Sequence, residues 1–161
     1  MLRFTVLVFV VCCGCSNLRF RQTSEIMAPT IKSNEVVTGH ISHFRRVVPQ
    51  RWDVVVFIPH PSTNGRNQVG LWCMRVVGLP SERINIREDG IYIDGKRQDQ
   101  PGQISDIRYA PTVEGLTAVS YPYQVPLNSY FLLGDNTTNS FDSRFWGCLD
   151  GSRIIGRIKG K

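Results

Sequence analysis

Short runs of β-branched and aromatic residues, each bounded by turn-forming residues, recur along this chain from about residue 35 onward. Such runs are typical of β-strands, whereas the 3.6-residue periodicity of an amphipathic helix is scarce after the first residues. We expect strands within residues 35–42, 52–59, 71–80, 83–98, 129–136 and 153–160. This density of short strands and turns predicts a mostly β, largely antiparallel fold, partly closed like a barrel.

The clearest local prediction is a hairpin in the stretch "INIREDGIYIDG". Isoleucines alternate with other residues on both sides of Asp89-Gly90, and Asp-Gly readily takes the positive φ angles of a tight turn. Residues 101–126 contain Pro, Gly, Ser and Thr without a sustained period. They predict a long connection that includes one strand near "LTAVSY", residues 116–121.

The chain begins with an apolar leader in which Arg3 precedes an uncharged run from Phe4 to Cys13. This is the outline of a signal peptide. As a helix the run would reach only about 15 Å, roughly half of a bilayer's hydrocarbon thickness, so a membrane span is the weaker alternative. Gly14 followed by Cys15 resembles a bacterial lipoprotein cleavage site, which makes Cys15 a candidate for lipidation.

We therefore expect a leader over residues 1–15 and a single β domain over residues 16–161. A chain of 161 residues is long enough to bury one sizeable core. Export would permit a disulfide between Cys73 and Cys148, but the sequence leaves their pairing open.

The net charge of +6 favours an anionic partner. The basic residues are scattered and lie mostly in the first third of the chain. They do not alternate with aromatic residues along one surface, as proteins that bind single-stranded nucleic acid require. A membrane surface is therefore favoured, and we expect no nucleic acid partner. His40, His43 and His60 have no metal-ligand spacing with Cys or carboxylates, and no nucleotide motif occurs, so we expect no metal and no cofactor.

Five motifs occur in the order and approximate spacing of the type I signal peptidases, the serine-lysine family of peptidase S26. They are "SEIMAPTI", "WDVVVF", "MRVVGLPSERI", "DGIYIDG" and "LGDNTTNSFDSRFWG". The chain resembles that family from about Ser24 to Lys161. The resemblance implies a signal-peptidase-like fold with a peptide groove and a location at the outer face of the cytoplasmic membrane or in the periplasm. It also implies an extended peptide, such as the signal peptide of a precursor protein, as the partner.

The resemblance also places the two catalytic groups of the family, and both are replaced here. Ile26 stands at the position of the serine nucleophile, and Met74 stands at that of the general-base lysine. A serine-lysine mechanism needs an oxygen lone pair and an amine that can accept the hydroxyl proton. Isoleucine offers no lone pair, and a thioether does not titrate as a base. The sequence therefore predicts that the catalytic dyad is lost.

Four further residues resemble supporting parts of the family's site. Ser24 matches a serine that helps to line the oxyanion hole, and Ser140 matches the serine that positions the lysine. Asp142 and Arg144 resemble an ion pair that holds the shape of the site, a role that needs no catalysis. Gly134 to Asn136 predict a turn in which Asp135 caps its own backbone.

The leading hypothesis is a catalytically inactive relative that binds extended peptides or a protein partner at the membrane surface. Binding through backbone groups and apolar pockets does not need the dyad. One alternative is an active signal-peptide-processing endopeptidase with a rearranged site that uses Ser24 or Ser140. The other is a structural lipoprotein whose groove is closed.

Overall fold

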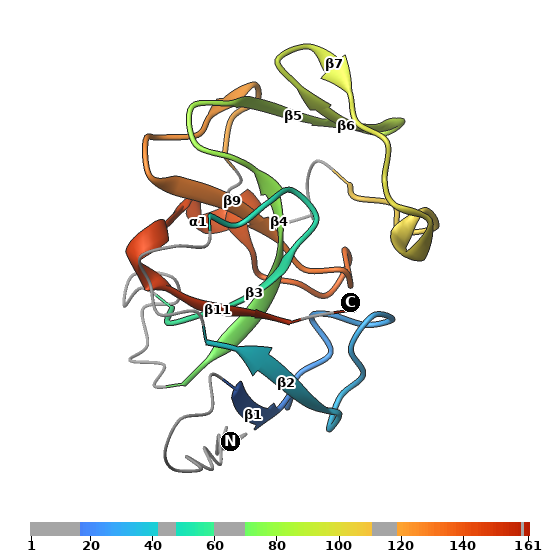
Figure 1. The fold of residues 1–161 in the computed structure, drawn as a ribbon. Helices are drawn as coiled ribbons and strands as arrows, with labels where there is room; N and C mark the ends of the chain where they lie inside the picture. Colours follow the sequence, from blue (N-terminus) through green and yellow to red (C-terminus); the bar gives the residue numbers. More distant parts are fainter. Residues whose placement is uncertain (1–16, 42–47, 60–69, 111–118, 159) are drawn as a thin grey trace.

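The computed structural model describes residues 17–41, 48–59, 70–110, 119–158 and 160–161 (Figure 1). The leader expected over residues 1–15, including Cys15, lies outside this described part. No helix in the described ranges is both long and apolar enough to cross a membrane.

Within the described ranges, eleven strands form two antiparallel sheets. The larger sheet has the order β1-β2-β11-β3-β4-β9-β10 and the smaller one the order β7-β6-β5-β8. The larger sheet consists of β1 (Asn17–Arg21), β2 (Val36–His40), β11 (Ile154–Ile158), β3 (Val54–Phe57), β4 (Trp72–Gly78), β9 (Ser129–Leu133) and β10 (Leu149–Asp150). The smaller sheet consists of β7 (Lys96–Arg97), β6 (Gly90–Ile93), β5 (Arg83–Arg87) and β8 (Tyr123–Gln124). The predicted mostly β, antiparallel fold is confirmed.

Helical structure is limited to short segments in the described ranges. They are the helix α1 (Ser143–Trp146) and the 3-10 turns η2 (Gly102–Ile104) and η3 (Gly151–Arg153). Each of the six segments expected to contain strands does contain at least one. The strand expected over 116–121 is wrong for residues 119–121, which are not extended into a sheet, and residues 111–118 lie outside the described ranges. In that region the chain instead joins the smaller sheet at β8.

The predicted hairpin is present, with a correction to its turn. Arg87 pairs with Gly90, so the residues that connect β5 and β6 are Glu88 and Asp89 rather than Asp89-Gly90. Gly90 has a φ of 145°. The second Asp-Gly of the stretch, Asp94-Gly95, has φ angles of 49° and 81° and joins β6 to β7. This second turn has the positive φ angles that the sequence predicted for the first.

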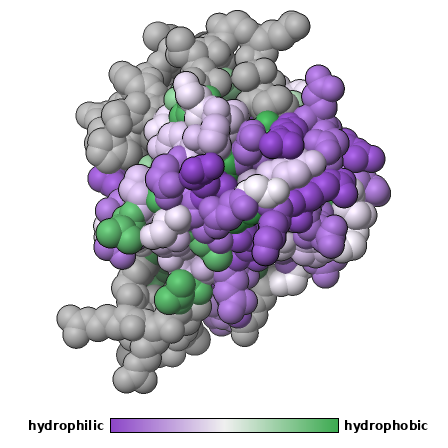
Figure 2. All heavy atoms as spheres, turned by 90° about the horizontal axis from the view of Figure 1, so that it is seen from above, coloured by the Kyte–Doolittle hydropathy of each residue, from purple (hydrophilic) through white to green (hydrophobic). Residues whose placement is uncertain are grey.

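Two apolar clusters share the central strands. In β9, Leu132 packs into the cluster on the larger sheet, whereas Phe131 and Leu133 pack into the cluster under the smaller sheet. This alternation follows from the two-residue period of a strand. Strand β1 and the β5–β7 hairpins lie at opposite ends of the molecule in Figure 1. Seen from the end that carries the hairpins, the described surface is mainly hydrophilic, with isolated apolar residues (Figure 2).

Candidate functional site

The loop between β1 and β2, which carries Ile26, packs against the segment that follows β9. The Ile26 carbonyl oxygen accepts a hydrogen bond of 3.0 Å from the backbone nitrogen of Asn136. At Gly134 an added Cβ atom would lie only 2.6 Å from that carbonyl oxygen and would also overlap the Ser140 hydroxyl. The close approach of Ile26 and Ser140 therefore requires a glycine between them.

Strand β4 brings Met74 to the same place. Arg75 pairs with Leu133 in the β4–β9 ladder, so the same antiparallel register continued by one residue sets Met74 opposite Gly134. Met74 is fully buried, and Ile26 packs against the cluster that contains it. The structure thus brings the two substituted positions, Ile26 and Met74, to the same apolar cluster.

Ser140 carries a buried hydroxyl that has no hydrogen-bond partner among the described residues. Leaving a buried polar group unpaired costs about 1–3 kcal/mol. A lysine side chain at position 74 would carry three donors, whereas the Met74 thioether is at best a weak acceptor. The Ser140 hydroxyl therefore has no donor or acceptor partner among the described residues.

Ser24 lies near these residues in sequence but is bonded elsewhere. Its hydroxyl oxygen accepts a hydrogen bond of 2.9 Å from Gln22 Nε2, and Gln22 Oε1 accepts one of 3.4 Å from Cys73 Sγ. Burial raises the pKa of Cys73 to about 12, so this thiol is neutral near pH 7. Among the described residues, no base forms a hydrogen bond with Ser24 or Cys73 that would activate it.

The two cysteines of the β domain are free thiols. Cys73 lies in the apolar cluster of the larger sheet, and Cys148 packs against the other cluster. Burial raises the pKa of Cys148 to about 12 as well. The pairing that the sequence left open is therefore not formed in this structure.

Asp142 and Arg144 form a buried ion pair. The Arg144 Nε and Nη2 atoms each lie 2.8 Å from one Asp142 carboxylate oxygen. Asp142 also accepts hydrogen bonds from the backbone nitrogens of Gly134, at 3.0 Å, and Arg144, at 3.2 Å, and so caps helix α1. The pair therefore fixes the glycine on which Ile26 and Ser140 converge.

Asp135 is a residue whose role the sequence analysis missed. It was expected to cap its own backbone, and that prediction is wrong, since its carboxylate is buried against Arg75. The Arg75 Nε and Nη2 atoms lie 2.8 Å and 2.5 Å from the two carboxylate oxygens. Tyr109 donates to the same carboxylate at 2.7 Å, and the Thr30 hydroxyl is a further partner. The group links the Ile26 loop, β4 and the segment after β9.

The electrostatics of this group are those of a paired buried charge. Burial alone would lower the pKa of Arg75, but the hydrogen bonds and negative charge of Asp135 outweigh it and raise that pKa. Burial, followed by the Asp135 charge, raises the pKa of Tyr109 well above its usual value. Arg75 therefore stays protonated and forms a buried ion pair with Asp135, while Tyr109 stays neutral and donates a hydrogen bond to the same carboxylate.

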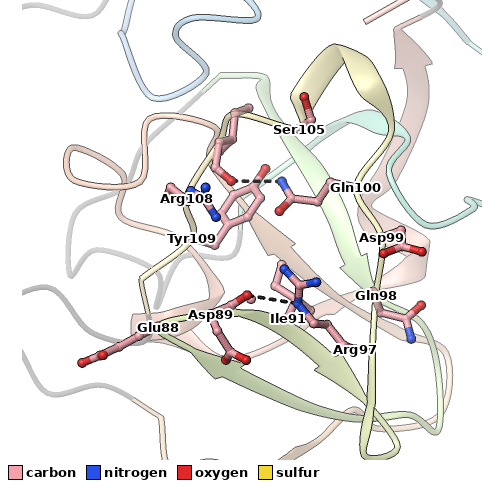
Figure 3. Close-up of a pocket in the computed structure, with 12 residues that line it drawn as sticks. Glu88, Asp89, Ile91, Arg97, Gln98, Asp99, Gln100, Ser105, Arg108 and Tyr109 are labelled. Carbon is pink, nitrogen blue, oxygen red and sulfur yellow. Dashed lines mark hydrogen bonds between the residues drawn. The ribbon is translucent and has the colours of Figure 1, made fainter.

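A cavity of about 140 Å³ lies elsewhere, between the β5–β7 hairpins and residues 98–109 (Figure 3). Its lining includes Asp89, Arg97, Gln100 and Arg108, and Tyr109 joins it to the Asp135 group. None of the site residues expected from the sequence lines it. It is therefore distinct from the groove expected near Ile26.

The family description "Signal peptidase, peptidase S26" matches residues 1–160. The chain belongs to this family. The Ile26 loop, β4 and the segment after β9, which converge in this structure, are the segments that carry three of the motifs resembling the type I signal peptidases.

Two curated relatives and one solved structure show how close this family member is to others. It is 30% identical over 134 residues to probable signal peptidase I-2 of Synechocystis sp., covering 83% of this chain and 57% of the relative. It is 35% identical over 138 residues to signal peptidase I of Leptolyngbya laminosa, covering 83% of this chain and 63% of that protein. The chain thus spans less than two thirds of the length of either relative.

The crystal structure of a signal peptidase I from Enterococcus faecalis is similar in fold. The TM-score is 0.52 at 28% sequence identity, with 69% of this chain and 97% of that chain covered. This likeness supports the assignment of the two antiparallel sheets to a signal-peptidase fold.

Proposed function

We propose that this chain is a signal peptidase I-like protein that binds extended peptides, such as signal peptides, or a protein partner without cleaving them. It acts in association with the membrane, at its outer face or in the periplasm. The apolar run from Phe4 to Cys13 and the family's signal-peptide specificity support this location. Removal of the leader is part of the same proposal, either as a signal peptide over residues 1–15 or, with lipidation at Cys15, by a cut directly before Cys15 so that this residue stays on the chain.

The observation that carries the proposal is the surroundings of Ser140. Its hydroxyl is buried and unpaired within the described residues, and Met74, at the family's lysine position, is fully buried. A site that kept a lysine base would use this hydroxyl as a partner for the amine. Loss of a serine nucleophile in another serine protease lowers turnover roughly a millionfold, and here the base is replaced as well.

The surroundings of Ser24 and Ser140 argue against either of them as a substitute nucleophile. The Ser24 hydroxyl has an amide, Gln22 Nε2, as its hydrogen-bond partner. Ser140 is buried behind Gly134, and no base contacts its oxygen among the described residues. Attack by either oxygen on a peptide carbonyl would need a proton acceptor.

Peptide binding can persist without the dyad. An extended peptide pairs with a strand through backbone groups and uses apolar pockets for side-chain selection. The Asp142–Arg144 and Arg75–Asp135 ion pairs hold the surrounding backbone in place without taking part in proton transfer. The Ile26 loop therefore retains a defined shape on which a peptide can dock.

The deciding experiment restores the dyad. We expect the purified parent and both single variants, Ile26→Ser and Met74→Lys, to leave a signal-peptide substrate intact. The double variant should cleave it, and adding Ser24→Ala to the double variant should slow cleavage without abolishing it, because Ser24 matches an oxyanion-hole serine and not the nucleophile. Cleavage by the parent at a rate comparable to the double variant would overturn the proposed inactivity.

Peptide binding is measured separately, by titrating the labelled parent protein with a signal peptide and following chemical shifts. Shift changes in the Ile26 loop and at Asn136 support binding at this site. No change at any peptide concentration would favour a structural lipoprotein with a closed groove.

A further inference from the structure

The outer face of strands β1 and β2 is basic and lacks carboxylates. Antiparallel pairing sets Asn17 against His40, Arg19 against Thr38 and Arg21 against Val36. The alternating burial of both strands turns these side chains away from the core, where Leu18 and Phe20 lie. We call this surface the β1–β2 face, and it consists of Asn17, Arg19, Arg21, Val36, Thr38 and His40.

The positive charge on this face is not neutralised within the described residues. Neither Arg19 nor Arg21 forms an ion pair with a described carboxylate. Among the described groups, Arg21 donates only to the backbone oxygen of Asn34, at 3.0 Å. The neighbouring Glu35 is paired with Lys161 at 2.8 Å, so it does not offset the two arginines.

The position of the face along the chain indicates what it meets. The apolar run ends at Cys13, and β1 begins at Asn17, so only residues 14–16 separate them. Three extended residues reach roughly 10 Å. If the chain is held in a membrane just before β1, by the apolar run or by a lipid on Cys15, β1 lies at the headgroup level, while the β5–β7 hairpins lie at the far end (Figure 1).

We propose that the β1–β2 face docks on a bilayer through the phosphates of anionic phospholipids, with Arg19 and Arg21 as the contact residues. Guanidinium groups match phosphate oxygens in bidentate geometry. A basic side chain near an anionic leaflet adds roughly a fivefold increase in binding, so two add roughly 30-fold. Val36, which is exposed on the same face, can contact the interface between the arginines and the acyl chains.

The test compares the partitioning of the full chain into vesicles of phosphatidylcholine alone and with added phosphatidylglycerol. The leader is common to all variants, so differences between variants report the face. We expect Arg19→Gln with Arg21→Gln to lower the preference for anionic vesicles by roughly 30-fold at low salt. High salt should remove the preference of the parent.

The matched control is Arg83→Gln with Arg87→Gln, which removes the same charge from exposed positions of β5 in the smaller sheet. It should retain the preference of the parent. An equal loss in the control, or an unchanged preference in the Arg19/Arg21 variant, would overturn the proposal. Circular dichroism and thermal unfolding verify that each variant is folded.

This inference rests on the membrane association in the proposed function, but the assay separates the two. Equal partitioning of the parent into neutral and anionic vesicles would refute the arginine face and leave anchoring by the leader in place. Failure to partition into either would refute the membrane association itself. Neither result depends on peptide binding or cleavage.

Discussion

Arg75 and Asp135 form a bidentate ion pair in which both side chains are almost completely buried. Their hydrogen bonds of 2.8 Å and 2.5 Å connect β4 directly after Met74 to the segment directly after Gly134. This pair fixes the relative position of the two segments that carry Met74 and Gly134.

Replacing Asp135 by Asn should leave the Arg75 charge buried without a counter-ion. We expect a loss of about 3–5 kcal/mol in the free energy of unfolding. For a chain of this size that corresponds to a fall of roughly 6–20 °C in the melting temperature, measured by thermal denaturation.

The control for Asp135→Asn is Arg157→Gln. Arg157 pairs with Asp53 at 3.5 Å in a partly exposed position, where an ion pair contributes at most about 1 kcal/mol. Equal destabilisation by the two variants would contradict the structural role assigned to the Arg75–Asp135 pair.

Gly134→Ala tests the close packing at the centre of the site. The new methyl group would lie 2.6 Å from the Ile26 carbonyl oxygen, and the backbone there cannot retreat without breaking its bond to Asn136. We expect destabilisation by about 1–3 kcal/mol, from overpacking, in denaturant unfolding. Gly102→Ala, where a methyl group meets open space, should change stability by less than about 0.5 kcal/mol. A tolerated Gly134→Ala would mean that Ile26 and Ser140 are not held against this glycine.

The fold was predictable wherever its signal is local. The alternating isoleucines of β5 and β6 form a strand pattern that is recognisable within each strand alone, so the sequence predicted this hairpin. Strands β8 and β10 have two residues each and are strands only because they pair with β5 and β9. No periodicity exists over two residues, so sequence patterns could not reveal them.

The same distinction applies to the site. Asp142 and Arg144 lie two residues apart, and their ion pair followed from the motif. Arg75 and Asp135 are 60 residues apart, and Tyr109 belongs to a connection without a strand pattern. Only the pairing of β4 with β9 brings them together, and that register is a property of the folded sheet. The signal that could have suggested a buried pair was the position of the two charges: Arg75 lies within the apolar run "MRVVG", and Asp135 directly follows the apolar run "FLLG".

Ser140→Ala should not destabilise the protein. Removing a buried hydroxyl without a partner relieves a cost of about 1–3 kcal/mol, offset by a small loss of packing, so the free energy of unfolding should stay constant or rise. Ser143→Ala is the matched control, because its hydroxyl oxygen accepts a 2.8 Å hydrogen bond from the Leu132 backbone nitrogen. That variant should lose about 1 kcal/mol or more in urea unfolding. A destabilising Ser140→Ala would indicate that the hydroxyl has a partner and would weaken the case for a lost lysine.

Alkaline pH provides a test of the burial of Cys73. Its pKa is raised by burial from 9.0 in the unfolded chain to about 12 in the folded one, so the folded state holds the proton more tightly. The stability that this thiol contributes is therefore complete below about pH 9 and decreases as the pH rises toward 12. Cys73→Ala removes the titrating group, so between pH 8 and pH 10.5 its free energy of unfolding should fall less than that of the parent, by roughly 1–2 kcal/mol. Denaturant unfolding at the two pH values measures this difference.

Two results would contradict the burial of Cys73: equal falls of the free energy of unfolding in parent and variant, or rapid reaction of the native Cys73 thiol with an alkylating agent at pH 8. Either would show that the thiol is accessible and would reopen the question of a nucleophile next to Met74 in the sequence.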